Sequence, residues 1–64
     1  MKSRDVVRYA QEHGWTFLRH GKGSHEVYAH PDFDYVLVIP MHGSKEIGPG
    51  LLAKLLKQID GTWR

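Results

Sequence analysis

The first stretch of the chain alternates apolar and polar residues with the period of a helix. Val6, Val7 and Ala10 recur on one face, and most other positions of this stretch are polar. Ser3 can cap such a helix, because its hydroxyl can accept a backbone N–H left unpaired in the first turn. Gly14 can end it, because glycine tolerates the left-handed conformation that follows many helices. The pattern therefore predicts a helix between these two residues.

Three segments rich in β-branched and aromatic residues follow this helix, and turn-forming residues separate them. They span Trp15–His20, Ser24–His30 and Tyr35–Ile39, and their composition is typical of strands. The last of the three is the most hydrophobic, so we expect it to lie in the middle of the sheet. Pro40 ends it, because proline has no N–H to donate to a strand ladder.

Alternation along a strand assigns its side chains to two faces. In the first predicted strand, one face receives Trp15, Phe17 and Arg19. In the second predicted strand, His25 and His30 fall on opposite faces, and His20 of the neighbouring strand is also expected to face away from His25. These three histidines are therefore not expected to gather at one point.

A second helix follows a glycine-containing loop. Pro49 suits its first turn, because proline needs no hydrogen-bond partner there, and Gly61 can end it. The apolar residues recur at helical spacing, and they are Leu51, Leu52, Leu55, Leu56 and Ile59. Lys54, Lys57 and Gln58 fall on the other side. This pattern predicts an amphipathic helix whose leucine stripe enters the core.

The predicted order is α-β-β-β-α, which indicates the α+β class. We expect a single domain over residues 1–64, with a three-stranded antiparallel sheet and both helices packed on one face. The same order occurs in double-stranded-RNA-binding domains. Shared order is an argument about fold, and function has to be argued from particular residues.

Composition narrows the class of protein further. The chain has 64 residues and no cysteine, which excludes a disulfide scaffold and a cysteine zinc site. A domain of this size buries only about 60% of the surface that its unfolded chain exposes, so a partner or an oligomer would help to stabilise it. The longest apolar run is residues 36–39, far short of the roughly 20 residues that span a membrane. No leader-like segment precedes the first helix, so we expect a cytoplasmic protein.

The distribution of charge is more informative than its total. The formal net charge is +2, which permits a nucleic-acid partner without requiring one. The segment from His13 to His25 contains Arg19 and Lys22 and no acidic residue. Cations beside a glycine turn can approach a phosphate closely, because backbone N–H groups are unscreened there. The alternative is an ordinary solvated hairpin tip.

His25 is the residue best suited to chemistry, since it follows Gly23 and Ser24 at the start of a predicted strand. Imidazole titrates near neutral pH, so it can take a proton from a ribose 2′-hydroxyl or give one to a leaving 5′-oxygen. Lys22 or Arg19 could stabilise the extra negative charge on phosphorus, and Ser24 could orient the imidazole or hold a phosphate. The alternative is a half-buried strand histidine without catalytic use.

A metal site is a further alternative for the histidines. His42 follows the end of the third predicted strand and could meet His25 there. A zinc site needs three or four converging ligands, and no carboxylate has a suitable spacing to these two residues. We therefore expect no metal and no other cofactor. Trp63 lies beyond the second helix and could fold back on the core or contact a partner.

Taken together, these residues resemble a known family. The first half of the pattern comprises Gly14-Trp15, Arg19, Gly23-Ser24-His25, Tyr28 and His30-Pro31. The second half comprises Val38-Ile39-Pro40, His42, Lys45-Glu46-Ile47, Gly50 and Leu55-Leu56-Lys57-Gln58-Ile59. In this order and spacing, the chain resembles the HicA toxin family, also called YcfA-like mRNA interferases, over almost its whole length.

The resemblance implies both a fold and an activity. It implies the fold of a double-stranded-RNA-binding domain and a metal-independent endoribonuclease that cleaves mRNA, stops translation and acts as the toxin of a type II toxin–antitoxin system. The family's catalytic histidine in Gly-Ser-His corresponds to His25. Lys22, Arg19, Ser24, Gly23 and His42 are then candidates for RNA and phosphate binding. The implied partner is a HicB-like antitoxin protein, which binds the toxin in a hetero-oligomer and blocks the histidine.

Two readings from other classes stay open at this point. The same basic hairpin could belong to a non-catalytic RNA-binding module, which would bind RNA in a salt-dependent manner without cutting it. It could also belong to a small protein whose basic face binds an acidic protein partner. A test for RNA cleavage would distinguish the endoribonuclease from both of these alternatives.

Overall fold

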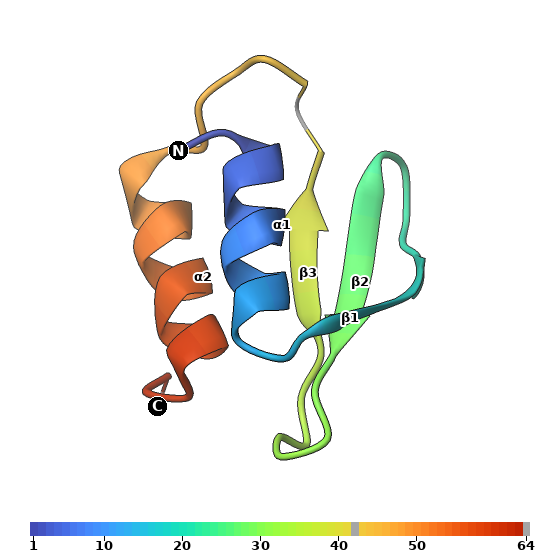
Figure 1. The fold of residues 1–64 in the computed structure, drawn as a ribbon. Coiled ribbons are helices and arrows are strands. Elements are labelled where there is room, and N and C mark those ends of the chain that lie inside the picture. The colour runs from blue at the N-terminus through green and yellow to red at the C-terminus, as the bar shows by residue number, and fades with distance from the viewer. Residues whose placement is uncertain (42, 64) are drawn as a thin grey trace.

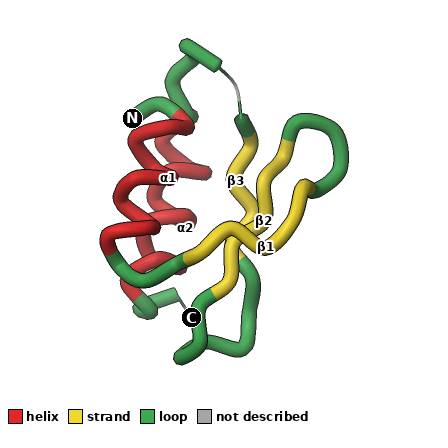
Figure 2. Tube along the Cα trace, turned by 45° about the vertical axis from the view of Figure 1, so that its right-hand side comes forward, coloured by secondary structure: helices red, strands yellow, loops and turns green. Residues whose placement is uncertain are grey.

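The computed structural model describes residues 1–41 and 43–63 and confirms the predicted order of helix, three strands and helix (Figure 1). The elements are α1 (Ser3–Glu12), β1 (Thr16–His20), β2 (His25–Ala29), β3 (Leu37–Pro40) and α2 (Pro49–Asp60). Both helices lie on the same side of the sheet (Figure 2). No helix in the described part of the chain is long and apolar enough to cross a membrane.

The sheet is an antiparallel meander in which β2, not β3, is the central strand. The expectation that Tyr35–Ile39 would be central is therefore wrong. The hydrophobicity of β3 has another cause: this strand contacts both helices, and Leu37 and Ile39 are fully buried beneath them. A strong apolar pattern thus marks the strand that the helices cover, which here is an edge strand.

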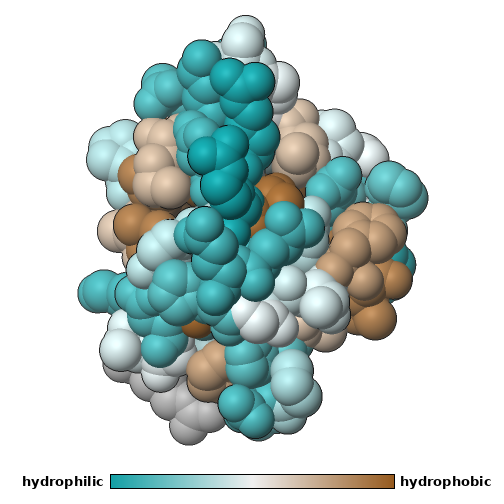
Figure 3. Space-filling view, in the orientation of Figure 1, coloured by the Kyte–Doolittle hydropathy of each residue, from teal (hydrophilic) through white to brown (hydrophobic). Residues whose placement is uncertain are grey.

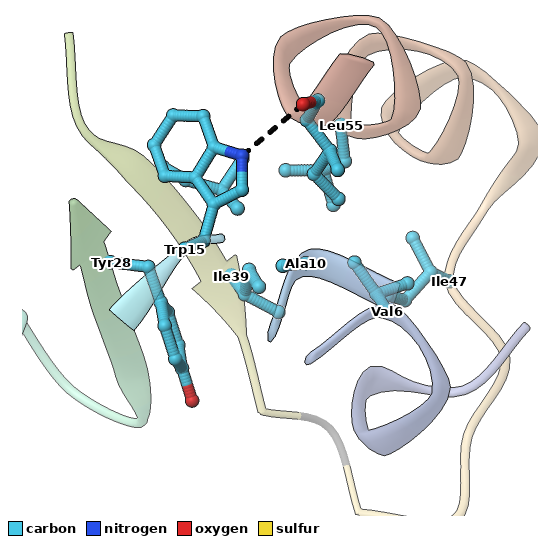
Figure 4. Packing of buried hydrophobic residues seen from close by; sticks show 9 residues of the cluster. Val6, Ala10, Trp15, Tyr28, Ile39, Ile47 and Leu55 are labelled. Carbon is cyan, nitrogen blue, oxygen red and sulfur yellow. Dashed lines mark hydrogen bonds between the residues drawn. The ribbon is translucent and has the colours of Figure 1, made fainter. Parts of the chain in front are cut away.

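One apolar cluster joins the helices to the sheet, and Figure 4 shows it from close by. Its buried members are Val6, Ala10, Trp15, Tyr28, Leu37, Ile39, Ile47, Leu55 and Ile59. Trp15 is 1% exposed, and its indole Nε1 donates a hydrogen bond of 3.2 Å to the backbone oxygen of Ile59. The ring of Phe33 stacks on the indole with 5.5 Å between the centroids. Trp15 therefore ties the start of β1 to the end of α2.

Strict alternation fails along β1. A bulge interrupts its pairing with β2 between Phe17 and Arg19, and all five residues of the strand are exposed. Trp15 is buried before the strand begins, whereas Phe17 is 48% exposed, so the two do not share one environment. The bulge adds a residue to β1 and shifts its register. Figure 3 shows an apolar patch on the side of the molecule that carries β1 and β2.

The start of α1 differs from its prediction at Ser3. Lys2 is the N-cap residue, and the Asp5 carboxylate accepts its backbone N–H at 2.9 Å. That hydrogen bond lowers the pKa of Asp5. Ser3 lies inside the helix, 1% exposed, and its hydroxyl donates to the backbone oxygen of Pro40 at 2.6 Å. A sequence pattern identifies a hydroxyl near a helix start but does not distinguish these two uses.

The second helix begins at Pro49, and Gly61, with a φ of 78°, terminates it as the C-cap residue, as predicted. Its buried face is turned slightly from the predicted stripe: Gln58, expected outside, is 8% exposed, whereas Leu51 is 38% exposed. The difference arises where the loop between β2 and β3 contacts the helix. The Tyr35 hydroxyl of this loop donates a hydrogen bond of 2.8 Å to the Gln58 backbone oxygen. This loop covers the last turn of α2 and leaves the first turn open.

Candidate active site

The connection between β1 and β2 is a tight hairpin turn. The N–H of Gly21 donates to the backbone oxygen of His25 at 2.8 Å, and the N–H of His25 donates to that of Lys22 at 3.3 Å. Gly23 has a φ of 64°, a conformation that favours glycine. The turn also reaches the end of β3, because the N–H of Met41 donates to the Ser24 oxygen at 3.1 Å. Residues 21–25 therefore form one hydrogen-bonded unit.

The imidazole of His25 is held at one nitrogen. Its Nδ1 lies 2.6 Å from the backbone oxygen of Lys22. A carbonyl oxygen can only accept a hydrogen bond, so this contact requires a proton on Nδ1. In the neutral ring, Nε2 then carries no proton and keeps a free lone pair. His25 is thus arranged to accept a proton at Nε2.

The register of the sheet places His25 on the face away from the helices. It pairs with Pro40, and Val27 pairs with Val38, whereas the alternating residues Leu37 and Ile39 are buried in the core. Arg19 is the partner of Val27 across β1 and β2. Cross-strand partners point to the same face, so Arg19 and His25 share the open face of the sheet.

The remaining candidates lie on the turn beside His25 or on the neighbouring strand. Lys22, Gly23 and Ser24 are exposed at the turn, and Arg19 makes a long hydrogen bond of 3.4 Å to the backbone oxygen of His20. The structure thus gathers the Gly-Ser-His turn and one guanidinium on the same side of the sheet. The candidate position 42 lies outside the described residues.

Other histidines have structural partners. His30 donates from Nε2 to the backbone oxygen of His13 at 2.9 Å, and its Nδ1 accepts the N–H of Asp32 at 3.0 Å. His13 is the C-cap residue of α1, with its Nδ1 2.8 Å from the backbone oxygen of Tyr9. His20 pairs with Glu26 and therefore lies on the face opposite to His25, as expected from alternation.

Tyr28 is a core residue. It is 3% exposed, and its hydroxyl donates to Glu26 Oε1 at 2.8 Å. Burial, assisted by the hydrogen bond and charge of Glu26, raises the pKa of Tyr28 to about 12. It is therefore unavailable for stacking on an RNA base.

Two other kinds of site, a metal site and a surface groove, are compared with the hairpin among the described residues. Within residues 1–41 and 43–63, no three histidine or carboxylate side chains are grouped so that they could hold a metal ion. A surface groove of about 490 Å³ is lined by Lys54, Lys57 and Trp63 among others, and none of the hairpin residues lines it. The Trp63 ring lies 5.8 Å from that of Tyr35, so the tail after α2 folds back on the loop before β3.

Sequence reasoning missed one residue of this site. A Cβ atom added to Gly21 would lie 3.1 Å from Cβ of His25 and 3.2 Å from Cγ2 of Val27. The sequence shows glycines on both sides of Lys22, which signals a turn. It does not show that one of them is packed against the histidine side chain.

The comparisons with known proteins give one match. Residues 3–60 match the family described as the HicA toxin of bacterial toxin–antitoxin systems. No curated protein and no solved structure matches the chain.

Proposed function

The chain belongs to the HicA toxin family, and from that premise we propose that it is an endoribonuclease that cleaves mRNA with His25 as its catalytic residue. The family makes it a toxin of a toxin–antitoxin pair. The observation that best supports the enzymatic proposal is the imidazole of His25, which is held at Nδ1 by a carbonyl oxygen and has Nε2 left to accept a proton. No metal ion is needed for the reaction that follows.

The proposed reaction uses the RNA's own 2′-hydroxyl as nucleophile. Nε2 of His25 takes the proton of that hydroxyl, and the 2′-oxygen forms a bond to the adjacent phosphorus. The bond between phosphorus and the 5′-oxygen breaks, and the leaving oxygen takes up a proton. The products are a 2′,3′-cyclic phosphate and a 5′-hydroxyl, so atoms and charges balance without an oxidant, a reductant or a metal.

Cationic and backbone groups beside His25 would hold the phosphate. Arg19 shares its sheet face, and Lys22, which directly precedes Gly23 and Ser24, is exposed. A guanidinium or ammonium stabilises the phosphorane more than the ground state, because the transition state carries more negative charge. The backbone around a left-handed glycine can bring N–H groups toward an anion.

The group that returns a proton to the 5′-oxygen is a second element of the proposal. Lys22, His42 and a water molecule are the candidates. The dependence of cleavage rate on pH decides among them, because a second titrating group gives the profile a second limb. If H42A loses one limb that the wild type has, His42 is the second group. If H42A keeps both limbs, K22A is the next variant to measure.

We also propose that the cognate antitoxin is a HicB-like protein that covers the open face of the sheet in a toxin–antitoxin hetero-oligomer. Val36 and Val38 are each 42% exposed, and Val38 lies across from Val27 beside the histidine. Apolar side chains next to a charged substrate site suit a protein partner that displaces the RNA. Binding there would shield His25 and stabilise a small domain at the same time.

The test of the catalytic proposal compares two histidine variants. H25A should lose RNA cleavage and growth arrest while it keeps the circular dichroism of the wild type. H20A is the matched control, because His20 lies one strand away on the opposite face, and it should cleave RNA normally. If folded H25A still cuts RNA, the proposed mechanism is wrong. If the wild type binds RNA in a salt-dependent manner and never cuts it, the chain is an RNA-binding module instead.

A further inference from the structure

We propose that Gly21 and the backbone oxygen of Lys22 are positioning elements that fix His25 as the general base of the cleavage step. This inference rests on the proposed function, in which His25 is the base, and it identifies what prepares the ring for that role. Two independent contacts of the hairpin carry it. One acts on the imidazole at Nδ1, and the other acts on the side chain at Cβ.

The contact at Nδ1 selects a tautomer. An imidazole in water exchanges between Nδ1–H and Nε2–H forms, and only the first can accept a proton at Nε2. The Lys22 oxygen, 2.6 Å from Nδ1, stabilises the Nδ1–H form. Once Nε2 has taken the substrate's proton, the ring is a cation, and its hydrogen bond to the same oxygen becomes stronger. The backbone therefore favours both the starting state and the product state of proton abstraction.

The contact at Cβ restricts the direction of the side chain. Gly21 lies so close to His25 that a Cβ there would be 3.1 Å from Cβ of the histidine and 3.5 Å from its backbone oxygen. The N–H of Gly21 donates to that same oxygen at 2.8 Å. Val27, 2% exposed, closes the other side, 3.2 Å from the same added atom. The hairpin is therefore packed so closely around His25 that a side chain at position 21 would require a neighbour to shift by a few tenths of an ångström.

The backbone conformation of Gly21 allows a substitution that tests its contact with His25 without adding backbone strain. It is not among the glycines with a positive φ, so alanine can adopt its backbone conformation. The only change in G21A is the added methyl group, which displaces His25 by a few tenths of an ångström. Gly50 gives a matched control, since an added Cβ there meets nothing within 4 Å.

The first experiment needs no RNA. Long-range ¹H–¹⁵N correlation spectra of the imidazoles in the ¹⁵N-labelled wild type, above the pH at which the rings are protonated, report which nitrogen carries the proton. His25 should be the Nδ1–H tautomer. His30 is the internal reference with the opposite tautomer, because its Nε2 donates and its Nδ1 accepts. An Nε2–H tautomer, or an even mixture, at His25 would overturn the proposal even if H25A is inactive.

The second experiment separates positioning from binding. Misplacement of a reacting group by 1 Å can cost about 100-fold in rate, so a shift of a few tenths should lower kcat of G21A about three- to tenfold. KM should change little, since Arg19 and Ser24 are untouched, and the Nδ1–H signal of His25 should weaken. G50A should match the wild type in both. A normal kcat for G21A, or a change in KM alone, contradicts the assignment.

The catalytic role of His25 and its positioning by the hairpin can be refuted separately. If His25 has the Nδ1–H tautomer but H25A still cleaves RNA, the proposed function is wrong and the hairpin merely orders a histidine. If H25A is inactive but the tautomer is Nε2–H, the function stands and the positioning inference is wrong. The spectrum of the wild type decides the second point even if G21A does not fold.

Discussion

Tyr28 shows how a single residue of this sheet links burial to pH. Its side chain is 3% exposed, and its hydroxyl donates to Glu26. Both effects favour the protonated phenol and raise its pKa to about 12. An unfolded tyrosine has a pKa of about 10. The folded state therefore keeps a proton that the unfolded state has already released between these two values.

Because the pKa of Tyr28 is raised in the folded state, the protein should become less stable at alkaline pH. Below about pH 10 both states are protonated, and Tyr28 contributes its full stability. As the pH rises from about 10 to about 12, the unfolded state is favoured by proton release, and the free energy of unfolding should fall by about 1–2 kcal/mol because of Tyr28. Urea unfolding at a series of alkaline pH values measures this fall. Y28F should lack that part of it, and parallel curves for the two proteins would refute the assignment.

At the scale of the elements, the end of α2 is held by the loop before β3. Gly61 ends the helix with a φ of 78°, and an added Cβ there would lie 2.6 Å from Cζ of Phe33. That ring has little room to move, because it stacks on Trp15 at 5.5 Å and on Tyr35 at 5.3 Å. Two separate costs should therefore act at Gly61, one from the backbone and one from contact.

A pair of glycine variants separates these two costs. Gly43 has a φ of 68°, and an added Cβ there meets nothing within 4 Å. G43A should therefore lose only the backbone cost of about 1–2 kcal/mol. G61A should lose about 1–3 kcal/mol more, because the methyl group overpacks the aromatic cluster. Urea denaturation of both variants gives the comparison, and equal losses would show that the contact with Phe33 carries no cost.

The same scale shows what a sequence can and cannot predict. The positions of Pro49 and Gly61 suffice to predict the ends of α2, because local rules govern helix ends, whereas the burial of Gln58 and the exposure of Leu51 depend on the rest of the fold. The prediction of the central strand is wrong, because β3 is hydrophobic where the two helices cover it and not because it lies in the middle of the sheet. The bulge after Phe17 and the hydrogen bond from Ser3 to Pro40 depend on residues distant in the sequence, so no local pattern contains them.

The candidate site, too, can be predicted from the sequence only in part. A glycine turn, a serine and a histidine with nearby cations are visible in the sequence as residue types, and their chemistry follows from those types. Which nitrogen of His25 is held, and the fit of Gly21 against it, follow from backbone geometry. The proposed role of His25 as a base rests on these two features, which become apparent only in three dimensions.

At the scale of the whole molecule, a net charge of +2 leaves RNA binding to a few local cations. R19A and K22A should each weaken binding of a non-cleavable RNA and should each reduce the slope of log affinity against log salt by about 1. K54A is the control, because Lys54 is exposed on α2 and lines the groove beside Trp63, away from the hairpin residues. Titrations at several salt concentrations measure the slopes. An unchanged slope for both hairpin variants would place the RNA elsewhere.

In the proposed mechanism, His25 drives metal-independent RNA cleavage through the 2′-hydroxyl, and the chemistry of the fragment ends reveals whether it does. Wild-type protein, H25A and H20A should be incubated with RNA in excess chelator, and the fragment ends should be identified by mass spectrometry. We expect 2′,3′-cyclic phosphate and 5′-hydroxyl ends from the wild type and H20A, and intact RNA from H25A. Fragments with 5′-phosphate ends, or the same cyclic ends from H25A, would contradict it.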